Sequence, residues 1–186
     1  KFEQDCTCKN CQVDILKNRG RDVAPFLVQM KKVYKKYDYM CHIHSKKTKT
    51  NDHGNEWRKY IFDHVFGNET YMRQVFSLFE NNSNLGIVMP ETYPVLELQA
   101  EWGGNREGVQ SLLTKMGIDM DLPEEPIFPV GDMFWMRTKA VEPIFDLDLS
   151  QADFPEEAGQ VNATIAHQIE RVWVYMAKAQ GYDYVK

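Results

Sequence analysis

The run Asn18-Arg19-Gly20-Arg21-Asp22 has residue types that can bind an anion or a sugar. It lies between a short apolar run and a segment with helical spacing, so backbone amides and a helix N-terminus can face a ligand. Gly20 permits a positive φ, and the two arginines offer planar guanidinium groups to phosphate or carboxylate. The structural alternative is that Asp22 caps the helix and pairs with an arginine. The residues by themselves favour that alternative.

Two histidines, His42 and His44, alternate in a second apolar run. Their side chains therefore point to the same face of a strand, and divalent metals accept imidazole readily. Alternatively, the histidines and the following Lys46 and Lys47 neutralise a diphosphate without a metal. A third interpretation is a polar network at the end of the strand with no ligand.

Three of the four cysteines, Cys6, Cys8 and Cys11, lie close together, whereas Cys41 lies in an apolar run. Three thiolates can donate to zinc or to an iron–sulfur cluster. A structural site usually has four ligands, however, and no second pair of ligands completes this one. We interpret the cluster as reduced loop cysteines and Cys41 as a small core residue.

Short apolar runs alternate with helical patterns along the chain, which indicates an α/β fold. We predict strands over 13–16, 37–44, 85–89 and 128–136, and helices over 25–34, 57–66, 68–80, 108–116, 142–145 and 162–179. The strand, loop, helix and strand within 13–44 have the dimensions of a parallel βαβ unit. Its loops follow the carboxyl ends of strands, where open α/β sheets bind ligands.

The 186 residues fit a single domain over 1–186, with 22 Lys+Arg against 27 Asp+Glu and a net charge of −5. This acidic balance argues against nucleic acid as a partner. No apolar run is long enough to span a bilayer. Because the chain does not begin with Met, we expect it to be a fragment of a longer protein.

Four blocks of the sequence, in order, resemble the signature of the rhamnan synthesis protein F family. The first is Asn18-Arg19-Gly20-Arg21-Asp22-Val23-Ala24-Pro25-Phe26-Leu27, and the others lie within 37–47, 128–137 and 153–171. Two small departures stand out. Val130 and Asp132 occupy a Pro-(Ala/Ser)-Gly-(Ser/Thr)-Met neighbourhood of the family, and Asn162-Ala163 replaces its common Asp-Gly.

The resemblance implies a glycosyltransferase that adds rhamnose, or a related deoxysugar, to a growing cell-wall or O-antigen polysaccharide. The donor would be a nucleotide sugar similar to dTDP-rhamnose, and the acceptor a polysaccharide or lipid-linked glycan. The implied location is the cytoplasm, at the inner face of the membrane. The alternative is a non-catalytic carbohydrate-binding or assembly module with the same fold.

The first two blocks also resemble a remote GT-A fold, a mixed sheet flanked by helices, here lacking its first strand or strands. His42-Ile43-His44 stands where that fold usually has Asp-x-Asp. A divalent metal, Mg²⁺ or Mn²⁺, is therefore compatible with the sequence but not required by it. The resemblance implies a metal set of His42, His44 and His167, although a lone helical histidine such as His167 is usually structural.

The same resemblance implies roles for residues of all four blocks. Asp132 would bind a sugar hydroxyl, and Trp135 would stack on a pyranose ring, although core packing is the usual role of such a tryptophan. Glu157, or in second place Asp153, would take the proton from the acceptor hydroxyl. The donor would be bound by Asn18, Arg19, Gly20, Arg21, Asp22, His44 and Lys46.

Overall fold

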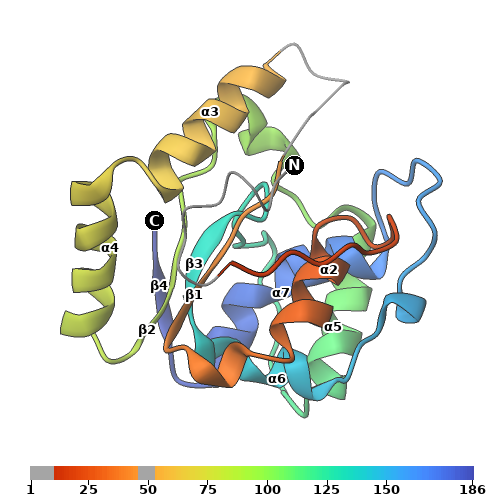
Figure 1. The fold of residues 1–186 in the computed structure, drawn as a ribbon. Helices are drawn as coiled ribbons and strands as arrows, with labels where there is room; N and C mark the ends of the chain where they lie inside the picture. The colour runs from red at the N-terminus through yellow and green to blue at the C-terminus, as the bar shows by residue number, and fades with distance from the viewer. Residues whose placement is uncertain (1–10, 46–52) are drawn as a thin grey trace.

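A four-stranded mixed sheet in the order β1-β3-β2-β4 forms the centre of the structure (Figure 1). The computed structural model describes residues 11–45 and 53–186. β1 and β2 both run antiparallel to β3, and β4 runs parallel to β2. The strands are β1 (Tyr39–His42), β2 (Leu85–Val88), β3 (Phe134–Arg137) and β4 (Asp183–Val185). The predicted mixed α/β architecture is thereby confirmed.

Helices cover both faces of this sheet (Figure 1). One apolar core packs α2, α5 and α7 against one face, and a second core packs α3 and α4 against the other. None of the helices within the described ranges is long and apolar enough to span a bilayer. The α-helices are α2 (Val23–Met30), α3 (Gly54–Val65), α4 (Glu69–Asn81), α5 (Arg106–Lys115), α6 (Glu142–Asp146) and α7 (Ile165–Ala179). Short 3₁₀ helices are η1 (Tyr34–Lys36), η2 (Pro94–Gln99), η3 (Gly103–Asn105), η4 (Thr138–Val141) and η5 (Gln151–Asp153).

The alternation of side chains along β1 and β3 decides which residues face which core. Phe134 and Met136 belong to the core beneath α7, whereas Trp135 belongs to the core beneath α3 and α4. His42 pairs with Phe134 across the two strands. It therefore lies on the α7 side of the sheet.

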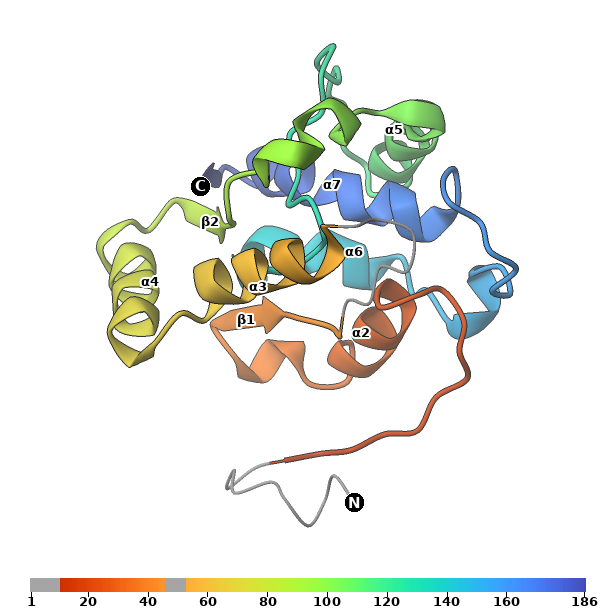
Figure 2. The ribbon, with the colours of Figure 1, turned by 90° about the horizontal axis from the view of Figure 1, so that it is seen from above.

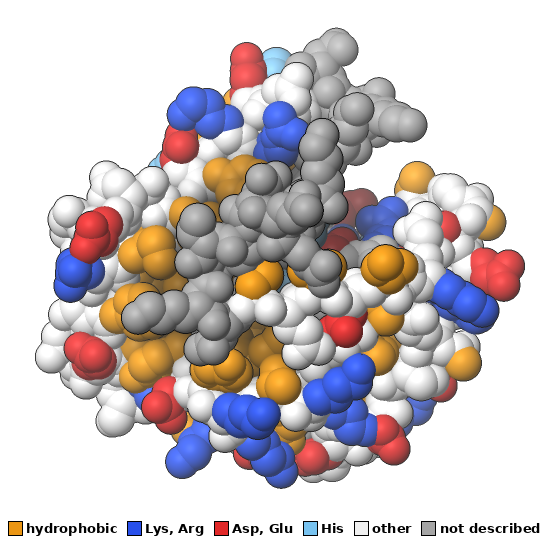
Figure 3. Space-filling model, in the orientation of Figure 1, with side chains coloured by type: hydrophobic (Ala, Val, Ile, Leu, Met, Phe, Trp, Pro, Cys, Tyr) orange, Lys and Arg blue, Asp and Glu red, His pale blue; other side chains and the backbone are white. Residues whose placement is uncertain are grey.

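Helical periodicity predicts α3, α4, α5 and α7 to within a few residues. The break between α3 and α4 falls at Gly67, where φ is 47°, and the Asn68 side chain caps α4 by accepting a hydrogen bond from the Tyr71 amide at 3.0 Å. α7 begins at Ile165 rather than at residue 162, because Ala163 has a left-handed φ of 59°. α2 ends at Met30, before the predicted end at residue 34, and the exposed Lys32, Lys35 and Lys36 follow it. Figure 3 shows basic side chains along the lower edge of that face of the molecule.

Some predicted strands are wrong. Residues 11–17 form no helix or strand, Ile15 is 97% exposed, and Figure 2 shows this segment running along the outside of the molecule. The run at 13–16 does not bury its apolar side chains against the sheet, so the predicted parallel βαβ unit is absent. The strand predicted over 128–136 is confined to β3, because a turn at Gly131 and Asp132 precedes it. β4 was not predicted.

Candidate functional site

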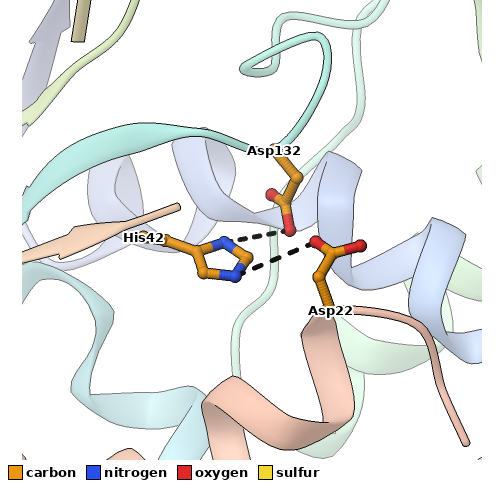
Figure 4. A group of neighbouring side chains, drawn as sticks. All are labelled: Asp22, His42 and Asp132. Carbon is orange, nitrogen blue, oxygen red and sulfur yellow. Dashed lines mark ion pairs between the residues drawn. The ribbon is translucent and has the colours of Figure 1, made fainter. Parts of the chain in front are cut away.

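Three polar side chains from distant segments meet beside the ends of β1 and β3 (Figure 4). Asp22 is the residue before α2, His42 ends β1, and Asp132 lies in the turn before β3. His42 Nδ1 lies 3.3 Å from Asp132 Oδ2, and His42 Nε2 lies 3.8 Å from Asp22 Oδ2. The imidazole thus faces a carboxylate at each of its two nitrogens.

His42 and Asp132 are enclosed by the core beneath α7, with 2% and 1% of their surfaces exposed. The Phe26 ring covers the His42 ring at a centroid distance of 4.3 Å. Asp22 is the most open of the three, with 19% of its side chain exposed. The group therefore opens to solvent on the Asp22 side.

The turn at Gly131 and Asp132 determines where the Asp132 carboxylate points. Both residues have positive φ, 99° and 53°. A Cβ on Gly131 would lie 2.7 Å from Ile61 Cδ1 and 3.0 Å from the Trp57 ring, so α3 packs closely on this glycine. Trp173 Nε1 donates a 2.9 Å hydrogen bond to Asp132 Oδ1, which leaves Oδ2 directed at His42.

Asp22 does not act as the side-chain cap that the structural alternative predicts. It occupies the N-cap position of α2, but its side chain accepts no capping hydrogen bond. Its carboxylate instead lies 3.5 Å from His44 Nε2 as well as near His42. Burial and the negative charge of Asp132 raise the Asp22 pKa, and the two histidines partly offset that rise.

The charges around His42 and its burial have opposite effects on its pKa. Burial favours the neutral imidazole, but the carboxylates of Asp132 and Asp22 outweigh this effect and raise the His42 pKa. The charges of the group are thus partly balanced. The hydrogen bonding is less complete, because Asp22 Oδ2, His42 Nδ1 and Asp132 Oδ2 are all buried without a hydrogen-bond partner. The 3.3 Å approach of Asp132 lacks hydrogen-bond geometry.

His44 connects this group to the turn before β3. Its Nε2 donates a 2.8 Å hydrogen bond to the Gly131 carbonyl, and its side chain is 17% exposed. The structure therefore brings His44 together with Asp22, His42 and Asp132. Lys46, predicted to bind the donor beside His44, lies outside the described residues.

The loop from Asn18 to Asp22 packs against the segment that precedes α7. The Arg19 Nε donates to the Phe154 carbonyl, and Arg19 forms a β-bridge with Glu156. Position 20 has no room for a side chain, because a Cβ there would lie 2.5 Å from Ala24 Cβ and 2.7 Å from the Phe154 ring. Asn18, at the start of the loop, is exposed.

Arg21 and Glu157 are brought together in this packing. The Arg21 amide donates to Glu157 Oε1 at 2.9 Å, and the Arg21 guanidinium donates to the Gln160 carbonyl at 2.9 Å and lies 4.0 Å from Glu170. The Arg21 side chain is 37% exposed. Arg21 is thus accessible to a ligand, with Glu157 beside its backbone.

Two other predicted site residues, Asp153 and Trp135, have separate surroundings. The Asp153 carboxylate accepts hydrogen bonds from the Ser150 amide and hydroxyl, which lower its pKa. Trp135 is buried on the opposite face of the sheet from His42, where its Nε1 donates to the Val65 carbonyl at 2.8 Å and its ring packs against Phe76. The structure does not bring Trp135 to the site.

His167, in the first turn of α7, forms a capping box with Thr164. Its Nδ1 accepts from the Thr164 hydroxyl at 2.7 Å, and its Nε2 is buried without a hydrogen-bond partner among the described residues. Burial and the charges of Arg21 and Arg171 lower its pKa to about 4. The Nδ1 of His167 is thus used in capping α7.

Two of the four cysteines, Cys11 and Cys41, lie among the described residues. Burial raises the pKa of the Cys41 thiol to about 12, which fits a packed residue rather than a reactive one. Cys11 is exposed. Cys6 and Cys8 lie outside the described residues.

The fold and site describe an α/β protein with carboxylate and imidazole groups gathered at one end of its sheet. The chain belongs to the family described as rhamnan synthesis protein F, whose match covers residues 2–182. The chain is 32% identical, over 164 residues, to the uncharacterized protein WxcX of two strains of Xanthomonas campestris pv. campestris. That alignment covers 86% of this chain but 23% of each relative. No solved structure matches the chain.

Sequence reasoning found the members of the site but not their grouping. It predicted a metal set of His42, His44 and His167, whereas the described residues whose ligand atoms lie within 4.8 Å of one another are Asp22, His42 and Asp132. The sequence feature that could have indicated this grouping is Asp132, a charged residue within the otherwise apolar run from Phe128 to Met136. Family membership connects the chain with rhamnan synthesis.

Proposed function

We propose that this domain transfers rhamnose or a related deoxysugar from a nucleotide-sugar donor to a growing cell-surface polysaccharide, within a GT-A-like fold. One observation carries the proposal: the first three blocks that resemble the family signature supply the groups that meet at one end of the sheet, and the fourth block contacts the loop of the first. Asp22 comes from the first block, His42 and His44 from the second, and Asp132 from the third. Glu157, from the fourth block, accepts a hydrogen bond from the Arg21 amide of the first. The GT-A assignment is supported by the mixed sheet with helices on both faces.

In the proposed reaction, Arg21 and His44 bind the diphosphate of the donor. Both side chains are partly exposed, and both are anchored through backbone carbonyls, Gln160 for Arg21 and Gly131 for His44. A guanidinium group on the diphosphate stabilises the charge that develops as the sugar–phosphate bond breaks. Arg19 donates to the Phe154 carbonyl and forms a β-bridge with Glu156, so we assign it the role of positioning the loop.

Glu157 is the proposed general base. It would take the proton of the acceptor hydroxyl while that oxygen bonds to the anomeric carbon and the nucleoside diphosphate leaves. Glu157 is exposed and lies beside Arg21, which fits this task. Asp153 fits it less well, because its lowered pKa makes it a weaker base and its carboxylate is held by Ser150. The acceptor would be a polysaccharide or lipid-linked glycan at the inner face of the membrane.

A non-catalytic sugar-binding or assembly module is the second candidate. The burial of His42 and Asp132 favours it, because neither side chain is open to a donor. The two functions differ in turnover and not in fold.

The test is titration calorimetry of the purified chain with dTDP-rhamnose and with common UDP- and GDP-sugars, followed by assays of nucleotide release with a rhamnan acceptor. We expect binding of one donor and release that needs the acceptor. Arg21→Ala should weaken binding at least about tenfold, whereas Arg73→Ala, which removes an exposed arginine paired with Glu69 on α4, should not. Binding without release supports the non-catalytic module, and no binding of any nucleotide sugar rejects the transferase.

A further inference from the structure

We propose that Asp22, His42 and Asp132 bind one divalent transition-metal ion. This inference does not depend on the proposed sugar transfer. It also differs from the histidine set predicted from the sequence, because two of its three ligands are carboxylates and His167 is not among them.

The first argument is the convergence of ligand atoms that lack hydrogen bonds. Asp22 Oδ2, His42 Nδ1 and Asp132 Oδ2 are buried and take part in the ion pairs with His42 but make no hydrogen bond, although buried polar atoms are nearly always hydrogen-bonded. Burying three such atoms from three separate segments at one place lowers the stability of the fold. A metal ion would satisfy all three residues at once.

The second argument is the distance between the ligand atoms. One ligand atom from each residue lies within 4.8 Å of the others. An ion with bonds of about 2.0–2.2 Å joins ligand atoms separated by up to about 4.4 Å. Small torsional changes, greatest at the more open Asp22, therefore bring the three residues into a single coordination sphere.

The third argument is charge. Two carboxylates lie beside one imidazole in an enclosed place, and the repulsion between Asp22 and Asp132 opposes their joint ionisation. A divalent cation would offset that repulsion. His44, at 3.5 Å from Asp22, lies on the open side of the group, where solvent would complete the coordination.

The ligand types indicate the class of metal. Carboxylates suit Mn²⁺ and Mg²⁺, and imidazole suits Zn²⁺ and other later transition metals, so a mixed set fits Mn²⁺ or Zn²⁺ best. The hydrogen bond from Trp173 to the other oxygen of Asp132 is the kind of outer contact that orients a ligating carboxylate. Bound metal would tie together the start of α2, the end of β1 and the turn before β3.

Mn²⁺ is the better probe, because thiolates of the cysteine cluster prefer softer metals. The metal-free chain is titrated with Mn²⁺, and free Mn²⁺ is counted from its six-line electron paramagnetic resonance spectrum. We expect one equivalent to bind and the thermal unfolding midpoint to rise with Mn²⁺ concentration. If neither Mn²⁺ nor Zn²⁺ binds at millimolar concentration, the proposal is wrong.

Asp132→Asn is the informative variant, because an amide oxygen still accepts the hydrogen bond from Trp173 while the ligating charge is lost. It should weaken Mn²⁺ binding at least about tenfold. Asp63→Asn removes an exposed carboxylate of α3 and is the matched control, which should bind as the parent does. Equal binding by Asp132→Asn and the parent would place the ion elsewhere and overturn the assignment.

A measurement on the unaltered chain covers the case in which Asp132→Asn does not fold. In ¹⁵N spectra of the histidine rings, Zn²⁺ should shift one ring nitrogen of His42 strongly and leave His64, on α3, unchanged. If Zn²⁺ in large excess over the cysteines leaves His42 unchanged, the proposal is contradicted.

Discussion

Trp173, in the middle of α7, donates its indole N–H to Asp132 Oδ1 at 2.9 Å, and both side chains are removed from water. This hydrogen bond joins the longest described helix to the turn that carries Asp132. Because its acceptor is charged and buried, we expect it to contribute more to stability than a neutral hydrogen bond of the same length.

Trp173→Phe should therefore lower the free energy of unfolding by at least about 2 kcal/mol, since it leaves a buried carboxylate oxygen unpaired. Urea unfolding measures the loss. Trp135→Phe is the matched control, because Trp135 is also buried but donates to a neutral carbonyl, that of Val65. Equal losses in the two variants would mean that the charge of Asp132 adds nothing.

Gly131→Ala should destabilise the protein by more than about 2 kcal/mol, because it combines an unfavourable positive φ with a clash against Ile61. Gly117→Ala separates the two effects: Gly117 has a φ of 73°, but no atom lies within 4 Å of its Cβ position. That control should lose only about 1 kcal/mol. A smaller loss for Gly131→Ala than for Gly117→Ala would contradict the tight packing of α3 on this turn.

Ala163→Gly should stabilise the protein by about 1 kcal/mol. Ala163 has a φ of 59°, which glycine adopts without strain. Ala152→Gly, in the 3₁₀ helix η5, should instead be destabilising by about 0.5–1 kcal/mol. Thermal unfolding compares the two, and a loss of stability in Ala163→Gly would argue that the left-handed conformation is not populated.

His167 should make stability depend on pH below neutrality. Its pKa is about 4 in the folded chain, against an ordinary value of 6.5, so the unfolded chain binds the proton more readily. The stability associated with its neutral form is present above pH 6.5 and is lost as pH falls through about 4. His167→Gln keeps a capping-box side chain but cannot titrate. Urea midpoints between pH 7 and pH 4 should fall less steeply in the variant; parallel curves would contradict the shifted pKa.

Amphipathic periodicity predicts the helices well because each helix carries its own apolar side. α3, α4 and α7 are the best examples, each with buried residues at helical spacing. A strand depends on a neighbour that the local sequence does not specify. The run at 13–16 therefore resembles a strand without forming one, and β4 escapes detection because its three residues, Asp183 to Val185, are not buried.

The candidate site is harder to predict because its grouping depends on the register of β1 with β3 and on one turn. The residue types of Asp22, His42, His44 and Asp132 are visible in the sequence, and so is their chemistry. Only the pairing of His42 with Phe134 and the left-handed φ of Asp132 bring them together. The same register places Trp135 on the opposite face of the sheet, in the core beneath α3 and α4. His167 lies in the first turn of α7, where its Nδ1 bonds to Thr164. The donor-binding and catalytic roles stay predictions.

The bond between Trp173 and Asp132 also has a consequence for the order of folding. Asp22 and Asp132 are separated by 132 − 22 = 110 residues, and the partner that holds Asp132 lies 41 residues later still. During synthesis, β1 and α2 leave the ribosome long before α7 does. The bond can therefore form only after α7 has been synthesised, and a nascent chain stopped before residue 173 would expose Asp132 without the donor that fixes it.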